Sequence, residues 1–394
     1  MFRTLLPVLL TVFLDLVGFG IVIPLLSFYA ETHGATPLQV TLLMASYSLA
    51  QFLMAPVWGA LSDRYGRRPV LLFSIAATAL GLAGFASAAS IPMLFLFRTL
   101  HGVATANIST AQAAVADLTP PDKRAMGMGL IGAAFGVGFT VGPVIGGELS
   151  TFGMAVPIWV AAGMSALNFV MAYFLLPETR KPGAAPTRAR SLNPARFWAV
   201  ARHPAVGLCV VLTFVLTFAF AMMESTFSLF AEHARALDAP AIGRMFGVAG
   251  LVMIFIQGGL IGPLVRALGE RALVPAGLLI LTVALALLPL APPVAPMLLV
   301  FIAIAIGQGI TGPSLQGLIS RGASEDEQGF VLGTNQSMSA LARALGPMVG
   351  GLAFTHQSAA APFYLSAVVV GLAFPLALLA VRRAPVRPAG SAGH

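Results

Sequence analysis

Ionisable side chains are scarce in this sequence. Only 9% of its 394 residues are Asp, Glu, Lys or Arg, whereas 58% are hydrophobic and the mean hydropathy is +0.91. Soluble globular domains carry about 25% charged residues. The composition therefore excludes a water-soluble globular protein of this length and indicates an integral membrane protein.

Cysteine and the common catalytic motifs are also missing. Cys209 is the single cysteine, so the chain can form no internal disulfide. The sequence has no clustered His and Cys residues at metal-ligand spacing, no nucleophile elbow and no GxxxxGK[ST] phosphate loop. We expect neither an enzyme nor an ATP-driven pump, and we expect no cofactor and no bound metal.

What the chain has instead is a series of apolar stretches of about 20 residues, each long enough to cross a hydrocarbon core as a helix. They predict an all-α membrane protein with two six-helix halves, 1–176 and 205–381, joined by a linker at 177–204 and followed by a tail at 382–394. The predicted spans are 5–30, 38–58, 69–88, 93–117, 126–150 and 154–176, then 205–231, 241–265, 272–291, 297–320, 328–355 and 362–381.

Two short matches indicate that the halves are parallel repeats. GALSDRYGRR at 59–68 shares four identical positions with GPLVRALGER at 262–271, and GPVIGG at 142–147 returns as GPMVGG at 346–351. The first match has an offset of 203 (59 to 262) and the second an offset of 204 (142 to 346). Two separate matches at nearly one spacing predict a duplicated chain.

The basic residues are distributed unevenly. Lys and Arg number 22 against 14 Asp and Glu, for a net charge of +8. In a twelve-span arrangement nearly all of them fall on one side, and the other side holds only Arg235 and, just inside its span, Arg244. Positively charged loops stay in the cytoplasm. We therefore expect both termini and the linker at the cytoplasmic face of the inner membrane, and the basicity implies no nucleic-acid partner.

Four motifs carry a resemblance to a known family. They are LDLVGFGIVIPLL at 14–26, GALSDRYGRRPVL at 59–71, RTLHGVATA at 98–106 and GVGFTVGPVIGG at 136–147. In this order, and on the first, second-to-third, fourth and fifth spans, they resemble the major facilitator superfamily and its twelve-span drug/proton antiporter branch, which includes the tetracycline exporters. The resemblance covers essentially the whole chain and implies a monomeric secondary transporter that exchanges a small molecule for protons across the bilayer.

The loop at 59–68 is the first place where the resemblance implies a role. Its glycines permit a tight turn and its side chains carry both charge signs. The resemblance implies a cytoplasmic gate in which Asp63 and the arginines bridge the halves when the cytoplasmic side is closed, with Asp117 as a partner. The second copy has Arg266 where Asp63 would fall, so the gate would be asymmetric; the alternative is a short basic loop that only sets topology. The gate residues are Gly59, Asp63, Arg64, Gly66, Arg67, Arg68 and Asp117.

Small residues line one face of two predicted helices. Gly138, Gly142 and Gly146 recur every four residues, and Ala342, Gly346 and Gly350 repeat that face. Such a face lets a neighbouring backbone approach closely. The resemblance implies that the two helices form a flexing seam between the halves, and ordinary helix packing is the alternative. The seam residues are Gly138, Gly142, Pro143, Gly146, Gly346, Pro347 and Gly350, where each proline favours a kink.

Four ionisable residues lie inside predicted spans, where an unpartnered charge costs several kcal/mol, so each is a functional candidate. Asp15 is about 15 Å into its span at 1.5 Å per residue. Arg98 is the first residue of a polar stripe along its helix. Arg98 and Glu224 could instead extend to the membrane surface. A third alternative is that all four residues form structural ion pairs. We expect Asp15, with or without Glu224, to carry the proton. The predicted proton and substrate site is Asp15, Arg98, His101, Gln112, Glu224 and Arg343.

The surroundings of these residues predict a largely apolar pocket, since several Phe and Met side chains lie near them along the sequence. The tetracycline exporters carry an acidic residue in the middle of the third span, where this chain has Gly81. We therefore expect export of another amphiphilic compound or a different drug. There are two alternatives. One is import of a small nutrient by a protein of the same fold, and the other is a receptor or assembly subunit that has lost transport.

Overall fold

The computed structural model describes residues 2–105, 107–119, 124–179, 206–322 and 325–383, and these form helices without strands. Most of the linker at 177–204 and of the tail at 382–394 lies outside the described residues. The helices of the first part are α1 (Phe2–Glu31), α2 (Pro37–Tyr65), α3 (Arg67–Ala86), α4 (Ile91–Ala104), α5 (Asn107–Leu118), α6 (Arg124–Leu149) and α7 (Val156–Leu175). Those of the second part are α9 (Gly207–Arg235), α10 (Ala239–Phe255), α11 (Ile261–Leu287), α12 (Ala295–Gly322), α13 (Glu325–His356) and α14 (Ala361–Arg383).

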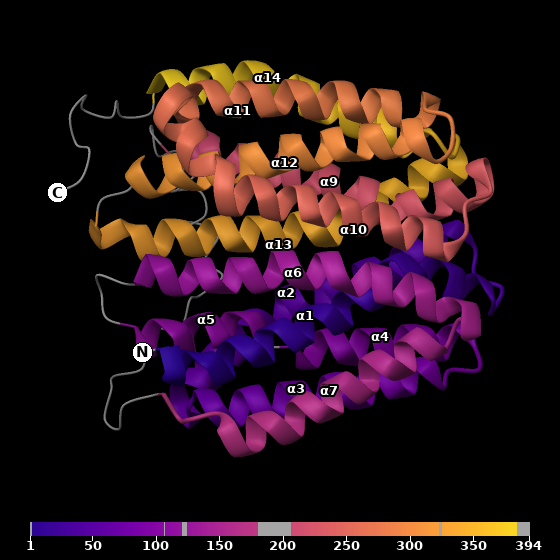
Figure 1. Cartoon of the computed structure of the whole chain (residues 1–394), viewed down its shortest axis with the longest axis vertical. Coiled ribbons are helices and arrows are strands. Elements are labelled where there is room, and N and C mark those ends of the chain that lie inside the picture. The colour runs from indigo at the N-terminus through magenta and orange to yellow at the C-terminus, as the bar shows by residue number, and fades with distance from the viewer. Residues whose placement is uncertain (1, 106, 120–123, 180–205, 323–324, 384–394) are drawn as a thin grey trace.

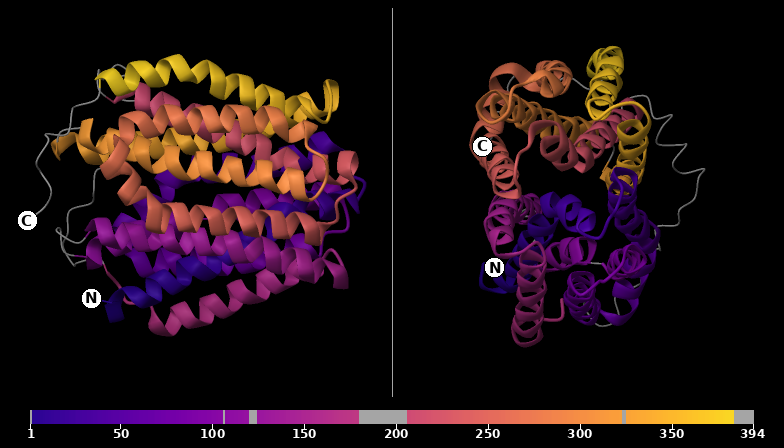
Figure 2. Two further views of the ribbon diagram at one scale, coloured as in Figure 1. Left: turned by 45° about the horizontal axis from the view of Figure 1, so that its top comes forward. Right: turned by 90° about the vertical axis from the view of Figure 1, so that its right-hand side faces the viewer.

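The helices run roughly side by side in two groups (Figure 1). The indigo to magenta helices of the first part form one group, and the orange to yellow helices of the second part form the other, as the end-on view in Figure 2 also shows. Both termini lie at one end of the bundle. We call this end the terminal face; the opposite end, where α1 and α9 finish and α2 and α10 begin, is the distal face.

Within the described ranges, nine helical segments are long and apolar enough to cross a membrane. One of them, Ala239–Leu290, is 52 residues long and contains two predicted spans, because α10 and α11 are joined by a π-helical turn at Ile256–Leu260. Ile91–Ala104 is shorter than the rest. The protein is thus a multi-pass helical membrane protein, and the count of twelve spans stays a prediction.

The motif at 59–68 is mostly helical, which differs from the expected loop. Gly59 lies inside α2, which runs seven residues past the predicted end of its span at Trp58, and only Gly66 separates α2 from α3. Gly66 has φ 106°, a conformation that glycine adopts without steric cost. Gly269, 203 positions later, has φ 72° at a kink in α11. The same backbone break therefore occurs at matching positions of the two halves.

The glycines of the small-residue faces pack within each half, while Pro143 of the same set packs against Gly243 of α10 in the other half, so a flexing seam stays a prediction. A Cβ atom added at Gly142 would lie 2.7 Å from the Val17 carbonyl oxygen, so this face of α6 packs against α1. A Cβ added at Gly346 would lie 2.8 Å from the Phe218 carbonyl oxygen of α9. Ordinary helix packing is thus what these faces do in this conformation, because a glycine face accepts the nearest backbone, and in each half that is the first helix.

The contact between the halves uses other faces of the same helices. A Cβ at Gly147 of α6 would lie 2.8 Å from the Ala239 carbonyl oxygen at the start of α10, and a Cβ at Gly351 of α13 would lie 2.9 Å from the Cβ of Thr41 in α2. These contacts lie toward the distal face. Nearer the terminal face the same test finds no atom within 4 Å of Gly129 and Gly132 of α6, nor of Gly258, Gly259 and Gly262 after α10. The contacts between α6 and α10 therefore extend from the distal end to the middle of α6, where a Cβ at Gly136 would lie 3.0 Å from Ile254 Cγ1.

Candidate functional site

Tyr47 of α2 is the centre of the predicted site, although the sequence analysis did not select it. Its ring is 6% exposed. The Arg98 guanidinium carbon lies 4.5 Å from the ring centroid, and the rings of His101 and Phe19 lie 5.1 and 5.7 Å away, centroid to centroid. A cation over an aromatic face gains more when both are removed from water, as here. Tyr47 therefore holds Arg98 inside the bundle.

Three of the four predicted charges lie within electrostatic range of this ring, and the fourth lies within range of one of them. Tyr47 is within electrostatic range of Arg98, Asp15 and Arg343, and Arg343 is within range of Glu224. Asp15 comes from α1, Arg98 from α4, Glu224 from α9 and Arg343 from α13. The structure thus brings together charges from both halves. We call these residues, with their aromatic partner and His101, the Tyr47 group: Asp15, Tyr47, Arg98, His101, Glu224 and Arg343.

Two glycines allow this assembly. A Cβ at Gly102 would lie 2.5 Å from the Tyr47 carbonyl oxygen, so only glycine lets α4 approach α2 closely enough to place Arg98 over the ring. A Cβ at Gly81 of α3 would lie 3.1 Å from the His101 Cβ. Since His101 covers Gly81, an acidic side chain at position 81 would displace the imidazole.

Arg98 and Arg343 differ in their exposure. Arg98 is 3% exposed and its Nε is buried without a hydrogen-bond partner. Arg343 is exposed although it lies midway along α13 and within electrostatic range of the buried Tyr47. A residue with these neighbours faces the space between the halves rather than lipid. Asp15 and Glu224 are half-buried, so the Tyr47 group has an accessible side.

The fourth predicted span is broken beside the site. α4 ends at Ala104, Thr105 has an extended backbone (φ −76°, ψ 109°), and α5 starts at Asn107. Side chains satisfy the carbonyls that the break releases: Trp58 Nε1 donates to Val103 O (2.6 Å) and Ser74 Oγ to Ala104 O (2.9 Å). Broken membrane helices are tolerated where the backbone is satisfied by protein or lines a cavity. Gln112 is half-buried in α5, beyond the break, and no hydrogen bond described here joins it to the Tyr47 group.

In this structure the predicted gate residues are linked within the first half, and Asp117 is a partner of Arg67 as expected. The bridge across the halves, which is expected when the cytoplasmic side is closed, stays a prediction. Arg67 Nη1 lies 2.5 Å from Asp63 Oδ1, and Arg67 Nε lies 3.1 Å from Asp117 Oδ2. Glu178, which the sequence analysis did not select, accepts the backbone N–H groups of Arg67 (2.9 Å) and Arg68 (3.2 Å). A carboxylate at the first amides of a helix is well placed for its dipole.

Of the remaining gate residues, Arg64 and Gly59 take no part in this network among the described contacts. Arg64 lies over the ring of its neighbour Tyr65, with its guanidinium carbon 5.3 Å from the centroid. Arg68 donates from Nη2 to the Tyr173 carbonyl oxygen (2.7 Å). The gate therefore consists of Arg67 and the three carboxylates around it.

The second half has a matching ion pair of opposite sign. Glu270, which corresponds to Arg67 at an offset of 203, pairs with Arg321, which corresponds to Asp117 at an offset of 204. In each half, the residue that follows the positive-φ glycine forms an ion pair with a residue near the end of a later helix. The two halves therefore carry corresponding ion pairs with the charges exchanged, and the asymmetric gate expected from Arg266 stays a prediction.

A groove of about 410 Å³ lies between α11 and α12 and has only Leu, Ile, Val and Ala in its lining. It contains none of the Tyr47 group. The groove is a poor candidate for binding a polar substrate, because pockets that recognise such ligands place a few polar groups among apolar ones.

Comparison with known proteins agrees with this geometry. The family model of the Major Facilitator Superfamily matches residues 8–347 and 259–394. The chain is 32% identical over 386 residues to the class C tetracycline resistance protein of Escherichia coli, covering 97% of each chain, and 26% identical to multidrug resistance protein 2 of Bacillus subtilis, covering 89% of each.

Solved structures show the same fold. The human organic anion transporter MFSD10 (TETRAN) is 30% identical, with a TM-score of 0.72 over 95% of this chain and 99% of that one. A bacterial homologue of the human lysosomal transporter Spinster, in an inward-facing and unoccupied conformation, is 16% identical, with a TM-score of 0.79 over 98% and 99%. Because these matches cover nearly all of this chain and of its relatives, the chain belongs to the major facilitator superfamily, a family of membrane transporters.

Proposed function

We propose that this protein is a proton-coupled antiporter that exports a small amphiphilic compound from the cytoplasm by alternating access. The observation that carries the proposal is the Tyr47 group, in which ionisable side chains of both halves meet around one buried ring. In this proposal the chain is a monomer with twelve spans in the inner membrane. Its terminal face, with both termini, is cytoplasmic.

The exchange would work through the charge balance of the Tyr47 group. Asp15 belongs to the first half and Arg343 to the second, and both are within electrostatic range of Tyr47. A proton on Asp15 removes a negative charge beside the ring that Arg343 also approaches, which would weaken the attraction between opposite charges of the two halves. A bound substrate that competes with the proton for these groups would shift the balance between inward-open and outward-open states. Glu224 lies in the same half as Arg343 and within electrostatic range of it, so a proton on Glu224 would instead leave Arg343 freer to interact with the first half.

The present conformation suits release of the proton and entry of the substrate from the cytoplasm. The contacts found between α6 and α10 run from the distal face to Gly136, and a Cβ at Gly129 or Gly132, nearer the terminal face, would meet no atom within 4 Å. The fold match with an inward-facing transporter supports the same state. In the proposed topology the distal face is therefore closed to the outside.

The substrate class is the least determined part of the function. The tetracycline and multidrug resistance relatives favour a drug. Gly81, covered by His101, leaves no room for the acidic residue that the resemblance would place in α3. A second candidate, an organic anion, is favoured by Arg98, whose buried Nε lacks a partner and could donate to a carboxylate or sulfonate.

A susceptibility panel in a pump-deficient host tests the proposal. Wild type, Asp15→Asn and Arg98→Ala are compared at equal expression against cationic, zwitterionic and anionic drugs. We expect wild type to raise resistance to one chemical class and both variants to lose it. The drug that responds is then used in proteoliposomes with and without a pH gradient. Equal transport under both conditions, or unchanged coupling in Asp15→Asn, would contradict proton exchange, and uptake toward the cytoplasmic side would favour import.

A further inference from the structure

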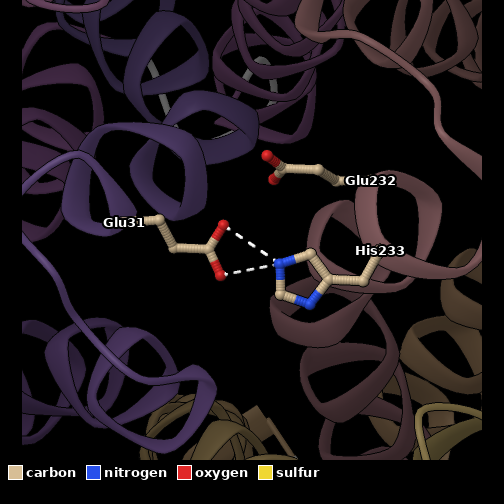
Figure 3. A group of neighbouring side chains, drawn as sticks. All are labelled: Glu31, Glu232 and His233. Carbon is tan, nitrogen blue, oxygen red and sulfur yellow. Dashed lines mark hydrogen bonds and ion pairs between the residues drawn. The ribbon is translucent and has the colours of Figure 1, made fainter.

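Three potential metal ligands meet at the distal face, far from the Tyr47 group. Glu31 ends α1, and Glu232 and His233 lie in the last turn of α9. Figure 3 shows the Glu31 carboxylate directed at the His233 imidazole, with the Glu232 carboxylate beside them. One ligand atom from each residue lies within 4.8 Å of the other two. We call these three residues the distal cluster.

The distances in the cluster suit a small cation. His233 Nε2 lies 3.0 Å from Glu31 Oε1 and 3.2 Å from Glu31 Oε2. Ligand atoms bound to zinc at about 2.0 to 2.1 Å in a tetrahedron are separated by about 3.3 Å. Glu31 and His233 are therefore already at ligand-to-ligand distance, and a turn of the Glu232 side chain would complete a three-ligand site with a fourth position open to water.

The charges also favour a cation over an ion pair alone. The cluster brings two carboxylates together with one imidazole, and burial and the Glu31 charge both disfavour a second negative charge on Glu232. Glu232 Oε2 is buried and accepts no hydrogen bond from a donor among the described residues, while its carboxyl group lies within hydrogen-bonding reach of Glu31. An unsatisfied buried acceptor is costly, and a charged one more so. A divalent cation would neutralise both carboxylates and bind this oxygen.

The access and the ligand types narrow the choice of cation. The His233 side chain is 41% exposed and that of Glu31 is 18% exposed, so an ion can enter from the distal side. Imidazole nitrogen with carboxylate oxygen is a donor set that suits zinc and its neighbours cobalt and nickel better than calcium or magnesium, which prefer oxygen alone.

We propose that the distal cluster binds a divalent transition-metal ion such as Zn²⁺ and thereby clamps the two halves together at the distal face. Glu31 belongs to the first half, and Glu232 and His233 belong to the second. The three ligands are in reach of one ion only while the distal face is closed, so the metal stabilises this state and slows its opening. The inference concerns metal binding and does not depend on which substrate the protein carries.

Metal binding by the purified full-length protein in detergent is the first test. Co²⁺ is used as a spectroscopic probe, and Zn²⁺ affinity is measured by competition. We expect visible absorption bands of tetrahedral cobalt and a rise in melting temperature with Zn²⁺. His233→Ala and Glu31→Gln should each weaken Zn²⁺ binding by at least about tenfold, since loss of one ligand of three removes a large part of the affinity.

The matched control is His356→Ala, which removes an exposed histidine at the distal end of α13, outside the cluster. It should bind Zn²⁺ as wild type does. Glu232→Gln, which keeps the size of the side chain, is the second variant in case another misfolds, and metal-free melting temperatures show whether each variant is folded. No cobalt bands in wild type, or wild-type Zn²⁺ affinity in the three cluster variants, would overturn the proposal.

A conformational readout follows from the same clamp. The test uses a variant with Thr41→Cys, at the contact between the halves, and Cys209→Ala. We expect Zn²⁺ to slow thiol labelling of position 41 by about threefold or more, because the reagent reaches this position only when the distal face is open. His233→Ala should remove this effect of zinc. Labelling that responds equally to zinc in both proteins would contradict the clamp even if the metal binds.

Discussion

At the residue scale, the site depends on charges placed where water is scarce. Asp15, Arg98, Glu224 and Arg343 could be selected from the sequence because an ionisable side chain in a long apolar run stands out. Tyr47 could not, because a tyrosine in an apolar helix is ordinary and only the close approach of α4 makes it the partner of Arg98. The distal cluster could not be predicted from the sequence either, because Glu31 and His233 are 202 positions apart and lie at helix ends.

The ring of Tyr47, rather than its hydroxyl, is expected to hold Arg98. Tyr47→Phe keeps the aromatic face, whereas Tyr47→Leu removes it. A desolvated cation–π contact contributes about 2 kcal/mol, which corresponds to about 30-fold. We expect Tyr47→Leu to lower the initial transport rate in proteoliposomes by about one order of magnitude and Tyr47→Phe to change it by less than about threefold. Equal losses in both variants would assign the role to the hydroxyl group.

At the element scale, the breaks and contacts of helices were harder to predict than the helices themselves. The long apolar runs predicted most of the helical segments. The break after α4 was not predicted, because it depends on Trp58 and Ser74, which donate hydrogen bonds to the carbonyl groups that the break leaves free. The small-residue face of α6 was visible in the sequence, and its partner was not. Periodicity shows that a helix has a close neighbour and does not say which one.

The packing of α6 against α1 is tested by one substitution at two glycines of the same helix. Gly142→Ala places a Cβ 2.7 Å from the Val17 carbonyl oxygen, whereas nothing lies within 4 Å of a Cβ at Gly132. Overpacking costs about 1 to 3 kcal/mol. We expect Gly142→Ala to lower the melting temperature in detergent and Gly132→Ala to leave it unchanged. Similar melting temperatures for the two variants would argue against the α1 contact.

The ion pair of the second half offers a charge exchange. Glu270→Arg and Arg321→Glu each place like charges together, while the double variant restores the pair with the signs that its counterpart in the first half has. Coupled residues show interaction energies of about 0.5 to 3 kcal/mol in such cycles. We expect each single variant to lose stability and the double variant to regain most of it, measured by thermal unfolding. Additive losses would mean that the two residues do not stabilise each other.

At the scale of the whole molecule, the multi-pass membrane character and the family followed from the sequence, because the hydropathy pattern and the family motifs extend over most of the chain. The contact between the halves did not. It depends on which end of the bundle is closed, and a transporter occupies more than one such state, so a single sequence pattern cannot specify it.

Closure of the distal face is tested by a cross-link between the halves. Thr41 of α2 and Gly351 of α13 approach to 2.9 Å between the Thr41 Cβ and a Cβ built at position 351. Both are replaced by cysteine in a Cys209→Ala background, which has no other thiol. We expect oxidation to form the bond and stop transport, and reduction to restore it. Each single cysteine serves as the control, and full activity after cross-linking would exclude alternating opening at this face.

Glu178 gives the arrangement of the first half a mechanical consequence. Its carboxylate accepts the first amides of α3, next to the arginine that joins Asp63 and Asp117. The segment that follows α7 is therefore fixed to the start of α3. Any movement of Glu178 away from α3 would have to break these two hydrogen bonds beside Arg67.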